Sequence, residues 1–288
     1  MKYSVVIPVL NPGDRLQKLI DTLLGQTAKP EEIVVVDSAS DDGAARRAAG
    51  TERVRTEFIE RADFDHGGTR DAALRSCGTP FVVMMTQDAL PVNDRCMENL
   101  LAPFSDPKVA AVCARQIAYP EASPAEKAVR AFRYTDETDV WDRADAARRG
   151  VKAFLLSDVC AAYRVSAYED AGGFAHPIGT NEDMLIAADF LEAGYKLAYR
   201  GDAAVFHSHD YTLREEYARN KKIGAFLAEY GDRFGGGSMA GEGFRMVKTV
   251  TAKLLREGRA GAAAGFWLDC AARALGSRAG KRAGERQA

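Results

Sequence analysis

The chain has 288 residues, and its 39 lysines and arginines nearly balance its 41 aspartates and glutamates, so the formal net charge at pH 7 is -2. The chain therefore lacks the basic signature of a general nucleic-acid-binding protein, and no nucleic-acid partner is expected. The hydrophobic content of 47% is normal for a globular protein, and the length allows one large α/β domain with an appendage or two domains.

The five cysteines lie far apart in the sequence, and none forms a Cys-x-x-Cys pair. Their odd number and wide spacing argue against a disulfide framework and against a structural zinc site, and they favour a reducing compartment. No apolar run approaches the roughly 20 residues that cross a bilayer. The first residues show no signal-peptide pattern, so we expect a cytoplasmic protein.

The N-terminal residues alternate between apolar runs and helical patterns. Residues 4–9 and 32–36 are β-branched runs that are typical of strands buried on both faces. Between them, turn residues 10–13 precede Leu and Ile residues at helical spacing over residues 16–24. A polar loop, residues 37–43, then opens onto an alanine-rich helix. This β-α-β-α order predicts a parallel sheet with right-handed crossovers.

The alternation continues through the next part of the chain. We expect a short strand over residues 58–64 and a helix that has Thr69 as its N-cap. Buried strands are expected over residues 81–85 and 109–114. Residues 120–150 are charged and predict helical or irregular structure.

Farther along, a helical pattern over residues 184–193 precedes Gly194, a typical C-terminal helix cap. Two strands, over residues 195–199 and 203–206, are expected to flank a turn at Gly201.

The remainder of the chain predicts helices. From Arg245 onward, basic residues outnumber acids, and a Phe-Trp-Leu run lies at residues 266–268. This pattern fits either an interfacial membrane helix or a helical packing arm with a solvated basic face. We therefore expect two parts, an α/β domain over residues 1–215 and a helical extension over residues 216–288.

Polar residues fall where expected strands end or helices start. They are Asp37, Asp88, the pair Glu182 and Asp183, and the pair His207 and His209. Each has a structural explanation as a cap or a hydrogen-bonded side chain. However, a parallel sheet gathers the carboxyl ends of its strands along one edge, so their joint placement predicts one site.

These side chains suit transfer from an activated donor that is linked through a diphosphate. Asp37 could accept a hydrogen bond from a base N–H, and Asp88 and a histidine could share a divalent cation that bridges the diphosphate. Asp183 or Glu182 could deprotonate an acceptor hydroxyl. A carboxylate at a helix N-terminus is stabilised as the anion, so burial would have to raise its pKa for it to act as a base.

Several motifs resemble those of family 2 glycosyltransferases with the GT-A fold. In chain order they are residues 5–11, the loop 36–43, Thr86-Gln87-Asp88-Ala89, and Glu182-Asp183 followed by a C-terminal histidine. A narrower resemblance to bacterial rhamnosyltransferases rests on residues 66–70, 86–89, 157–164 and 207–211. The resemblance implies an α/β, Rossmann-like and mostly parallel central sheet flanked by helices, with a C-terminal helical extension.

The resemblance also implies roles for individual residues. Those expected near the nucleotide are Pro8, Val9, Asn11, Asp37, His66, Arg70 and Gln87. Asp183 would be the catalytic base, and Glu182 would orient the acceptor. Asp88 would bind Mg²⁺ or Mn²⁺, with His207 as the favoured histidine ligand and His209 as the reserve.

Some positions depart from the family pattern. Thr86 stands where many relatives carry the first acid of an Asp-x-Asp metal motif, so Asp88 is the one carboxylate there. Binding of Mg²⁺ would then depend on the phosphates of the donor. Ala39 stands where glycine is usual, and Asp71 and Asp158 stand where asparagine is expected.

The implied function is an inverting sugar transfer, with dTDP-L-rhamnose as the expected donor. The acceptor would be a hydroxyl of a cell-surface glycan or of a lipid-linked glycan, at the cytoplasmic face of the membrane, with peripheral contact through the C-terminal tail. A UDP- or GDP-sugar donor is one alternative. A non-catalytic sugar-nucleotide-binding protein is another, favoured by the single carboxylate at Asp88. A Rossmann dehydrogenase is disfavoured because no Gly-x-Gly-x-x-Gly follows the first strand.

Overall fold

The computed structural model describes residues 1–234 and 239–284, which form two compact units. Unit 1 comprises Met1–Arg115, Asp136–Asp145 and Phe154–His207. Unit 2 comprises Gln116–Thr135, Ala146–Ala153 and the chain from Ser208 onward. Two segments from the first part of the chain thus pack with the C-terminal helices, and a simple division of the chain at residue 215 does not predict this packing. The assignment of residues 1–215 to a catalytic domain and of residues 216–288 to an extension stays a prediction.

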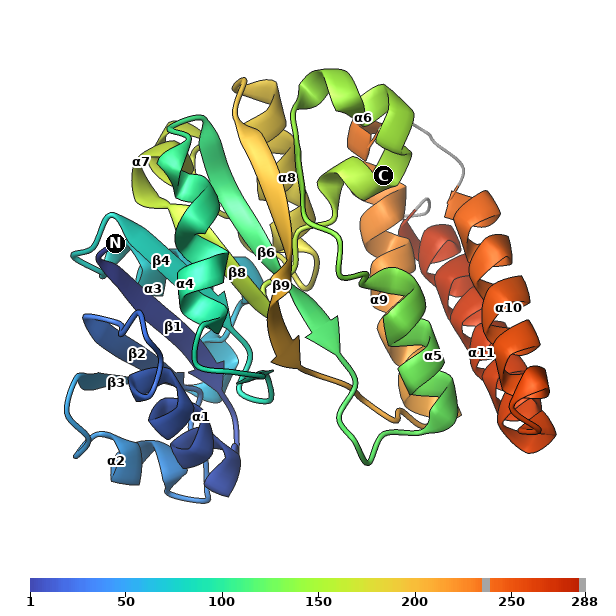
Figure 1. The fold of residues 1–288 in the computed structure, drawn as a ribbon, viewed down its shortest axis with the longest axis horizontal. Helices are drawn as coiled ribbons and strands as arrows, with labels where there is room; N and C mark the ends of the chain where they lie inside the picture. Colours follow the sequence, from blue (N-terminus) through green and yellow to red (C-terminus); the bar gives the residue numbers. More distant parts are fainter. Residues whose placement is uncertain (235–238, 285–288) are drawn as a thin grey trace. The chain divides into compact units, whose positions relative to one another are not determined.

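The N-terminal half of unit 1 alternates strands and helices, as predicted (Figure 1). Its elements are β1 (Tyr3–Val9), α1 (Asp14–Leu24), β2 (Glu32–Asp37), α2 (Ala44–Ala48), β3 (Val54–Phe58), α3 (His66–Arg75) and β4 (Phe81–Met85). β1 runs parallel to β2 and β4, and β2 runs parallel to β3. Both faces of β1 are buried, which explains its unbroken apolar sequence.

The second half of unit 1 adds antiparallel strands to the same sheet. Its elements are β5 (Leu90–Pro91), α4 (Cys96–Leu101), β6 (Val109–Ile117), β7 (Asp139–Trp141), β8 (Cys160–Arg164), α7 (Val165–Asp170), α8 (Glu182–Glu192) and β9 (Lys196–Phe206). β8 is antiparallel to β4 and β6, and β9 is antiparallel to β5 and β7. The strand order within the described residues is β3-β2-β1-β4-β8-β6-β9-β5, with β7 beside β9. The α/β fold is confirmed. β1–β4 pair in parallel, whereas β8 and β9 take part in antiparallel pairs, so the sheet formed by the described residues is mixed.

Helices cover both faces of this sheet. α1, α2 and α4 share one apolar core with alternate residues of β1 and β2, among them Val5, Ile7 and Val35. α3 contacts β1 and β2, and α7 and α8 contact β8 and β9. An aromatic cluster of Tyr163, Tyr168 and Phe174 belongs to this second set of elements.

Two sequence predictions near α3 were wrong. β3 spans Val54–Phe58 rather than residues 58–64, because it stands at the end of the strand order, where half-exposed polar side chains replace a buried apolar run. α3 begins at His66, because Asp65 rather than Thr69 is the N-cap. The Asp65 carboxylate accepts a hydrogen bond from Gly68 N at 2.7 Å, and Asp65 N donates to Thr69 Oγ1 at 3.1 Å.

The predicted turn at Gly201 was also wrong, since β9 is one continuous strand. A Cβ at Gly201 would lie 2.1 Å from the carbonyl oxygen of Asp136, so the glycine permits a close backbone approach. Residues 139–141, within the segment expected to be helical or irregular, form β7 against β9.

Unit 2 is helical. Its elements are α5 (Pro124–Arg133), α9 (Leu213–Tyr230), α10 (Met239–Arg256) and α11 (Ala260–Gly284), and α6 (Arg143–Arg149) begins in unit 1 and ends in unit 2. Val129 of α5 shares a core with Val250 and Leu254 of α10 and Phe266 of α11. These helices confirm the predicted C-terminal helical extension. Among the described residues, no helix combines the length and the apolarity needed to cross a bilayer.

The packing of α9 against α11 depends on glycines. A Cβ at Gly280 would lie 1.9 Å from the carbonyl oxygen of Lys221, and a Cβ at Gly276 would lie 2.3 Å from that of Tyr217. The backbones of α9 and α11 therefore approach each other so closely that only glycine is accommodated at positions 276 and 280.

Candidate active site

Asp37, the last residue of β2, organises the loops that follow β1 and β2. Its buried carboxylate accepts a hydrogen bond from Ser40 N at 3.3 Å and another from the Ser40 hydroxyl. Ser40 Oγ in turn accepts from Asn11 N at 2.8 Å, and Asn11 Oδ1 accepts from Asp41 N at 2.8 Å. These contacts fix the position of the Asp37 carboxylate beside the end of β1. If Asp37 accepts a hydrogen bond from a nucleobase N–H, as predicted, its carboxylate would bind the nucleobase and Ser40 at the same time.

The backbone of these loops is constrained. Asn11 and Ala39 have φ angles of 47° and 56°, in the left-handed region that glycine favours. An alanine in this conformation costs about 1 kcal/mol, which explains why the resemblance implies glycine at this position. Pro8 and Val9 pair in register with Val36 and Asp37, so the residues expected to line the nucleoside pocket are neighbours.

Gln87 joins the ends of β1 and β4. Its Oε1 accepts a hydrogen bond from Leu10 N at 2.8 Å, and its Nε2 donates to Leu10 O at 3.2 Å. At the same edge, Thr86 N donates to Val159 O at 3.3 Å, which joins β4 to the start of β8. The Gln87 amide therefore holds the backbone, and its expected place near the nucleotide stays a prediction.

A buried charge cluster lies where α3, β8 and α8 meet. Arg70 Nε is 3.6 Å from Asp158 Oδ2, and Arg70 Nη1 is 3.2 Å from Glu182 Oε1. The Tyr163 hydroxyl donates to Asp158 Oδ1 at 2.5 Å. Asp158 N is 3.4 Å from Asp183 Oδ2, so Asp183 completes the cluster. One guanidinium thus faces three carboxyl groups.

Burial changes the protonation of this cluster. Desolvation raises the pKa of Asp158 to about 7, although Arg70 opposes the shift. Desolvation also raises the pKa of Asp183 well above its usual value, and repulsion from Glu182 and Asp158 adds to the effect. Asp183 Oδ1 accepts from Met184 N at 2.8 Å. Burial therefore opposes the effect of the α8 N-terminus, which is the condition that a base at this position requires.

His66 and Arg70 lie one turn apart on α3. Arg70 Nη1 donates to His66 O at 3.0 Å and lies 3.4 Å from His66 Nδ1. The His66 ring packs edge-on against Phe64, with 5.1 Å between the ring centroids. The structure thus commits the Arg70 guanidinium to the buried carboxylates. A nucleotide contact for His66 and Arg70 stays a prediction.

Asp88 and His207 also lie together. His207 Nε2 is 3.6 Å from Asp88 Oδ2, because the pairing of Leu90 with Phe206 brings β5 beside the end of β9. A carboxylate oxygen and an imidazole nitrogen suit a divalent cation such as Mn²⁺. His209 follows two residues later and belongs to unit 2.

The predicted residues of unit 1 thus form a continuous series along one edge of the sheet. Hydrogen bonds join Asp37 to Ser40 and Ser40 to Asn11, and Leu10, the neighbour of Asn11, bonds to Gln87. Next to Gln87, Thr86 bonds to Val159, and Asp88 contacts His207. Asp158, the neighbour of Val159, contacts Asp183 and Arg70. Sequence reasoning did not find the parts played by Ser40 and Tyr163. Asp158 had one signal, an acid where the resemblance implies asparagine.

Comparison with known proteins identifies the family. Residues 4–172 match the family described as "Glycosyl transferase family 2". The chain is 37% identical to the O-antigen chain rhamnosyltransferase RfbN of Salmonella typhimurium, over 98% of this chain and 90% of that protein. It is 38% identical to the O-antigen chain rhamnosyltransferase WbaN of Salmonella anatum, over 97% of this chain and 89% of that protein.

Solved structures share the fold. The mannosyltransferase PcManGT from Pyrobaculum calidifontis, in complex with GDP-Man and Mn²⁺, aligns with a TM-score of 0.58 and 22% identity, over 96% of this chain and 73% of that chain. S. aureus TarS 1-349, in complex with UDP-GlcNAc, aligns with a TM-score of 0.58 and 16% identity, over 100% of this chain and 92% of that chain. Because the family match covers more than half of the sequence and two relatives align over nearly all of it, this chain belongs to glycosyl transferase family 2 and is a glycosyltransferase.

Proposed function

We propose that the protein is an inverting rhamnosyltransferase that uses dTDP-L-rhamnose and a hydroxyl of a cell-surface or lipid-linked glycan. The observation that carries the proposal is the similarity to two O-antigen chain rhamnosyltransferases over almost the whole chain. The raised pKa of Asp183, at the N-terminus of α8, supports a reaction that needs a base.

In the proposed reaction, Asp183 accepts the proton of the acceptor hydroxyl, and Glu182 orients the acceptor. The hydroxyl oxygen forms a bond to the anomeric carbon of the donor sugar. The bond from that carbon to the diphosphate breaks on the opposite face, so the configuration inverts and the nucleoside diphosphate leaves with the electron pair. Asp37, Pro8, Val9 and Asn11 would hold the nucleoside at the ends of β1 and β2.

The donor set at Asp88 and His207 fits Mg²⁺ or Mn²⁺, with His209 as a further ligand supplied by the chain two residues on. A bound cation would neutralise the negative charge that develops on the leaving diphosphate. A solved structure with the same fold holds GDP-Man and Mn²⁺, which supports a nucleotide sugar and a divalent metal in this chain as well.

A comparison of donors tests this proposal. We expect release of dTDP from dTDP-L-rhamnose, and calorimetric binding of dTDP at least about tenfold tighter than that of UDP or GDP, a difference of about 1.4 kcal/mol. Tighter binding of UDP or GDP than of dTDP would indicate that the donor is a UDP- or GDP-sugar. Binding without turnover, with or without acceptor glycans, would support the non-catalytic alternative.

A second experiment measures how turnover depends on the metal concentration. Asp88→Asn removes the one carboxylate of the Thr86–Ala89 motif and should raise the Mn²⁺ concentration needed for half-maximal turnover by about tenfold. Glu98→Gln, an exposed acid on α4, should leave that concentration unchanged.

Peripheral contact with an anionic membrane surface is part of the proposal. The exposed apolar side chains of α10 and α11 are Phe244, Leu255, Trp267, Leu268 and Leu275. Trp267 Nε1 donates to Thr251 Oγ1 at 3.1 Å, which places this tryptophan beside α10. Lys248 and Arg256 of α10 are exposed, and so is Arg259, whose Nε lies 3.6 Å from Glu257 Oε2. Exposed apolar and basic side chains on the same helices are typical of helices that lie on membranes.

Vesicle co-sedimentation of the full chain tests the membrane contact. Trp267→Ser combined with Leu268→Ser should reduce binding to vesicles that contain anionic lipid by about tenfold, because two exposed apolar anchors are lost. Leu213→Ser, at the start of α9, is the matched control and should bind like the wild type. Equal co-sedimentation of all three proteins with the vesicles would contradict the proposed membrane contact.

A further inference from the structure

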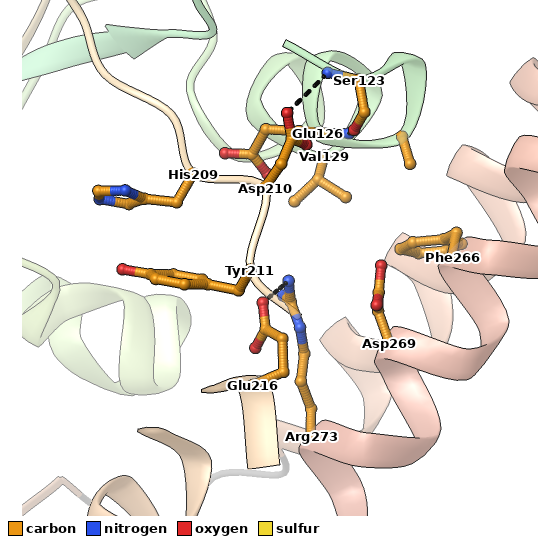
Figure 2. Close-up of a pocket in the computed structure, with 11 residues that line it drawn as sticks. Ser123, Glu126, Val129, His209, Asp210, Tyr211, Glu216, Phe266, Asp269 and Arg273 are labelled. Atoms are coloured by element: carbon orange, nitrogen blue, oxygen red, sulfur yellow. Dashed lines mark hydrogen bonds and ion pairs between the residues drawn. The ribbon is translucent and has the colours of Figure 1, made fainter. Parts of the chain in front are cut away.

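Unit 2 contains a polar cavity (Figure 2). One of its lining residues, His209, is a proposed metal ligand, and the proposed reaction assigns no part to the others. The cavity measures about 70 Å³, within about 380 Å³ of unfilled space that includes open solvent. Side chains from α5, α9 and α11 and from the segment before α9 line it. The residues that matter most are Asp210, Tyr211, Glu216, Phe266, Asp269 and Arg273.

Local contacts fix the charged walls of this cavity. Asp210 Oδ2 accepts a hydrogen bond from Ser123 N at 3.2 Å, which ties the segment before α9 to the start of α5. Arg273 Nη2 donates to Glu216 Oε1 at 2.6 Å, and Glu216 is 3% exposed. The dashed lines in Figure 2 mark both contacts. The cavity is therefore preformed rather than assembled from mobile surface side chains.

Asp269 differs from the other acids. Its carboxylate makes no hydrogen bond or ion pair with the part of the chain that the structure describes, and it extends from α11 beside Phe266 into the open space. Burial raises its pKa, Arg273 opposes the shift, and the carboxylates of Glu216 and Asp210 raise it further. A half-buried acceptor in such surroundings is stabilised by a ligand that donates a hydrogen bond to it.

The opposite wall is aromatic. Tyr211 stacks on His209 with 4.7 Å between the ring centroids and an interplanar angle of 24°, and Arg219 lies over the Tyr211 ring at 5.9 Å. Figure 2 shows the two rings stacked one above the other, with both side chains extending away from Phe266 and Asp269. Because His209 and Arg219 lie against the ring faces of Tyr211, the edge of this ring is the part that borders the polar groups.

This combination selects one class of ligand. Four acids line the cavity, of which Glu216 pairs with Arg273 and Glu126 with Arg130. The remaining two, Asp210 and Asp269, leave a negative charge that would repel a phosphate or another anion. The described residues that could jointly hold a metal ion do not include these acids. A neutral sugar at the open mouth of the cavity matches this chemistry, because its hydroxyls donate to carboxylates while its C–H groups contact the edge of an aromatic ring.

We propose that this cavity binds a neutral hexose or deoxyhexose unit of the acceptor glycan, remote from the hydroxyl that reacts. The inference rests on the proposed function, since it names a binding site for the acceptor of that reaction. Asp210 and Tyr211 follow His207 by three and four residues, so the covalent chain links the cavity directly to the end of β9. Asp269 would accept from a sugar hydroxyl, and the edge of the Tyr211 ring would contact the C–H groups of the sugar.

The test uses the full chain and acceptor oligosaccharides of increasing length. Asp269→Asn and Tyr211→Ala should each raise the KM of long acceptors by about tenfold, the effect of losing one hydrogen bond to a charged group or one ring contact. For Asp269→Asn, whose side chain does not contact the residues proposed to bind the metal, the KM of the shortest acceptors, kcat and donor hydrolysis should not change. Glu257→Gln, an exposed acid between α10 and α11, is the matched control and should behave as the wild type.

Direct binding provides a readout that does not depend on turnover. Saturation-transfer NMR with methyl α-L-rhamnoside and neutral disaccharides should detect binding to the wild type and a loss of about tenfold in either variant. Spermidine binding that Asp269→Asn abolishes, without sugar binding, would identify a cation site and overturn the inference. A KM effect that is independent of acceptor length, or absent in both variants, would also overturn it. Failure of the wild type to turn over any donor would instead count against the proposed function.

Discussion

Asp183→Asn is expected to lower kcat for sugar transfer by about 10³-fold while leaving nucleotide binding unchanged. The amide keeps the size of the carboxylate and its contact with Met184 N, but it cannot accept the proton of the acceptor hydroxyl. Because burial raises the pKa of Asp183, the wild-type rate should fall as the pH decreases through this raised pKa. Steady-state rates against pH, with calorimetry of the nucleoside diphosphate, measure both effects.

Glu192→Gln supplies the control, since this exposed acid lies at the other end of α8. It should transfer sugar at the wild-type rate and show the same pH profile. Wild-type turnover by Asp183→Asn would show that another group removes the proton, and Glu182 would be examined next.

Arg70→Met is expected to lower the free energy of unfolding at pH 8 by about 3–5 kcal/mol. The variant keeps the buried side-chain volume but leaves Asp158 and Glu182 without their cation. The folded-state pKa of Asp158, about 7, already lies above its usual value, so the folded protein binds extra protons between about pH 4 and pH 7 and loses stability as the pH rises through this window. Loss of Arg70 moves the upper limit of this window higher, so the deficit should grow from pH 5 to pH 8. Urea unfolding at both pH values measures it.

Two variants define the specificity of this effect. Adding Asp158→Asn to Arg70→Met removes one of the unpaired charges and should recover part of the lost stability, because asparagine still accepts from the Tyr163 hydroxyl. Arg75→Met, which breaks a half-exposed pair with Asp71 on the same helix, should cost less than about 1 kcal/mol. An Arg70→Met protein as stable as the wild type at both pH values would contradict the view that this arginine holds the cluster together.

The sequence predicts the central strands well because they are buried on both faces. β1, β2 and β4 read as unbroken apolar runs, and nothing outside each segment is needed to recognise them. β3 is harder, since a strand at the end of a sheet carries half-exposed polar residues. Gly201 resembles a turn residue in sequence. In the structure a glycine is needed there because the Asp136 carbonyl approaches closely, and Asp136 is 65 residues away in the chain.

For the site, sequence reasoning found positions better than contacts. Asp37, Asp88 and Asp183 were recognisable because each follows a strand or opens a helix, and the structure places them on one edge of the sheet. The pairing of Arg70 with Asp158 and Glu182 was not predictable, because it joins residues that are distant in the sequence and depends on the packing of α3 against neighbouring elements.

The composition of unit 2 restricts how such an enzyme can diversify. Val129 of α5 is buried against Val250 and Leu254 of α10 and Phe266 of α11, so a helix from the middle of the gene completes the core of the C-terminal part. One recombination event near residue 215 would join α9, α10 and α11 of one transferase to α5 of another, so this core would be built from two sequences that did not evolve together. An exchange of unit 2 that preserves its packing would therefore require two separated stretches of coding sequence to be inherited together.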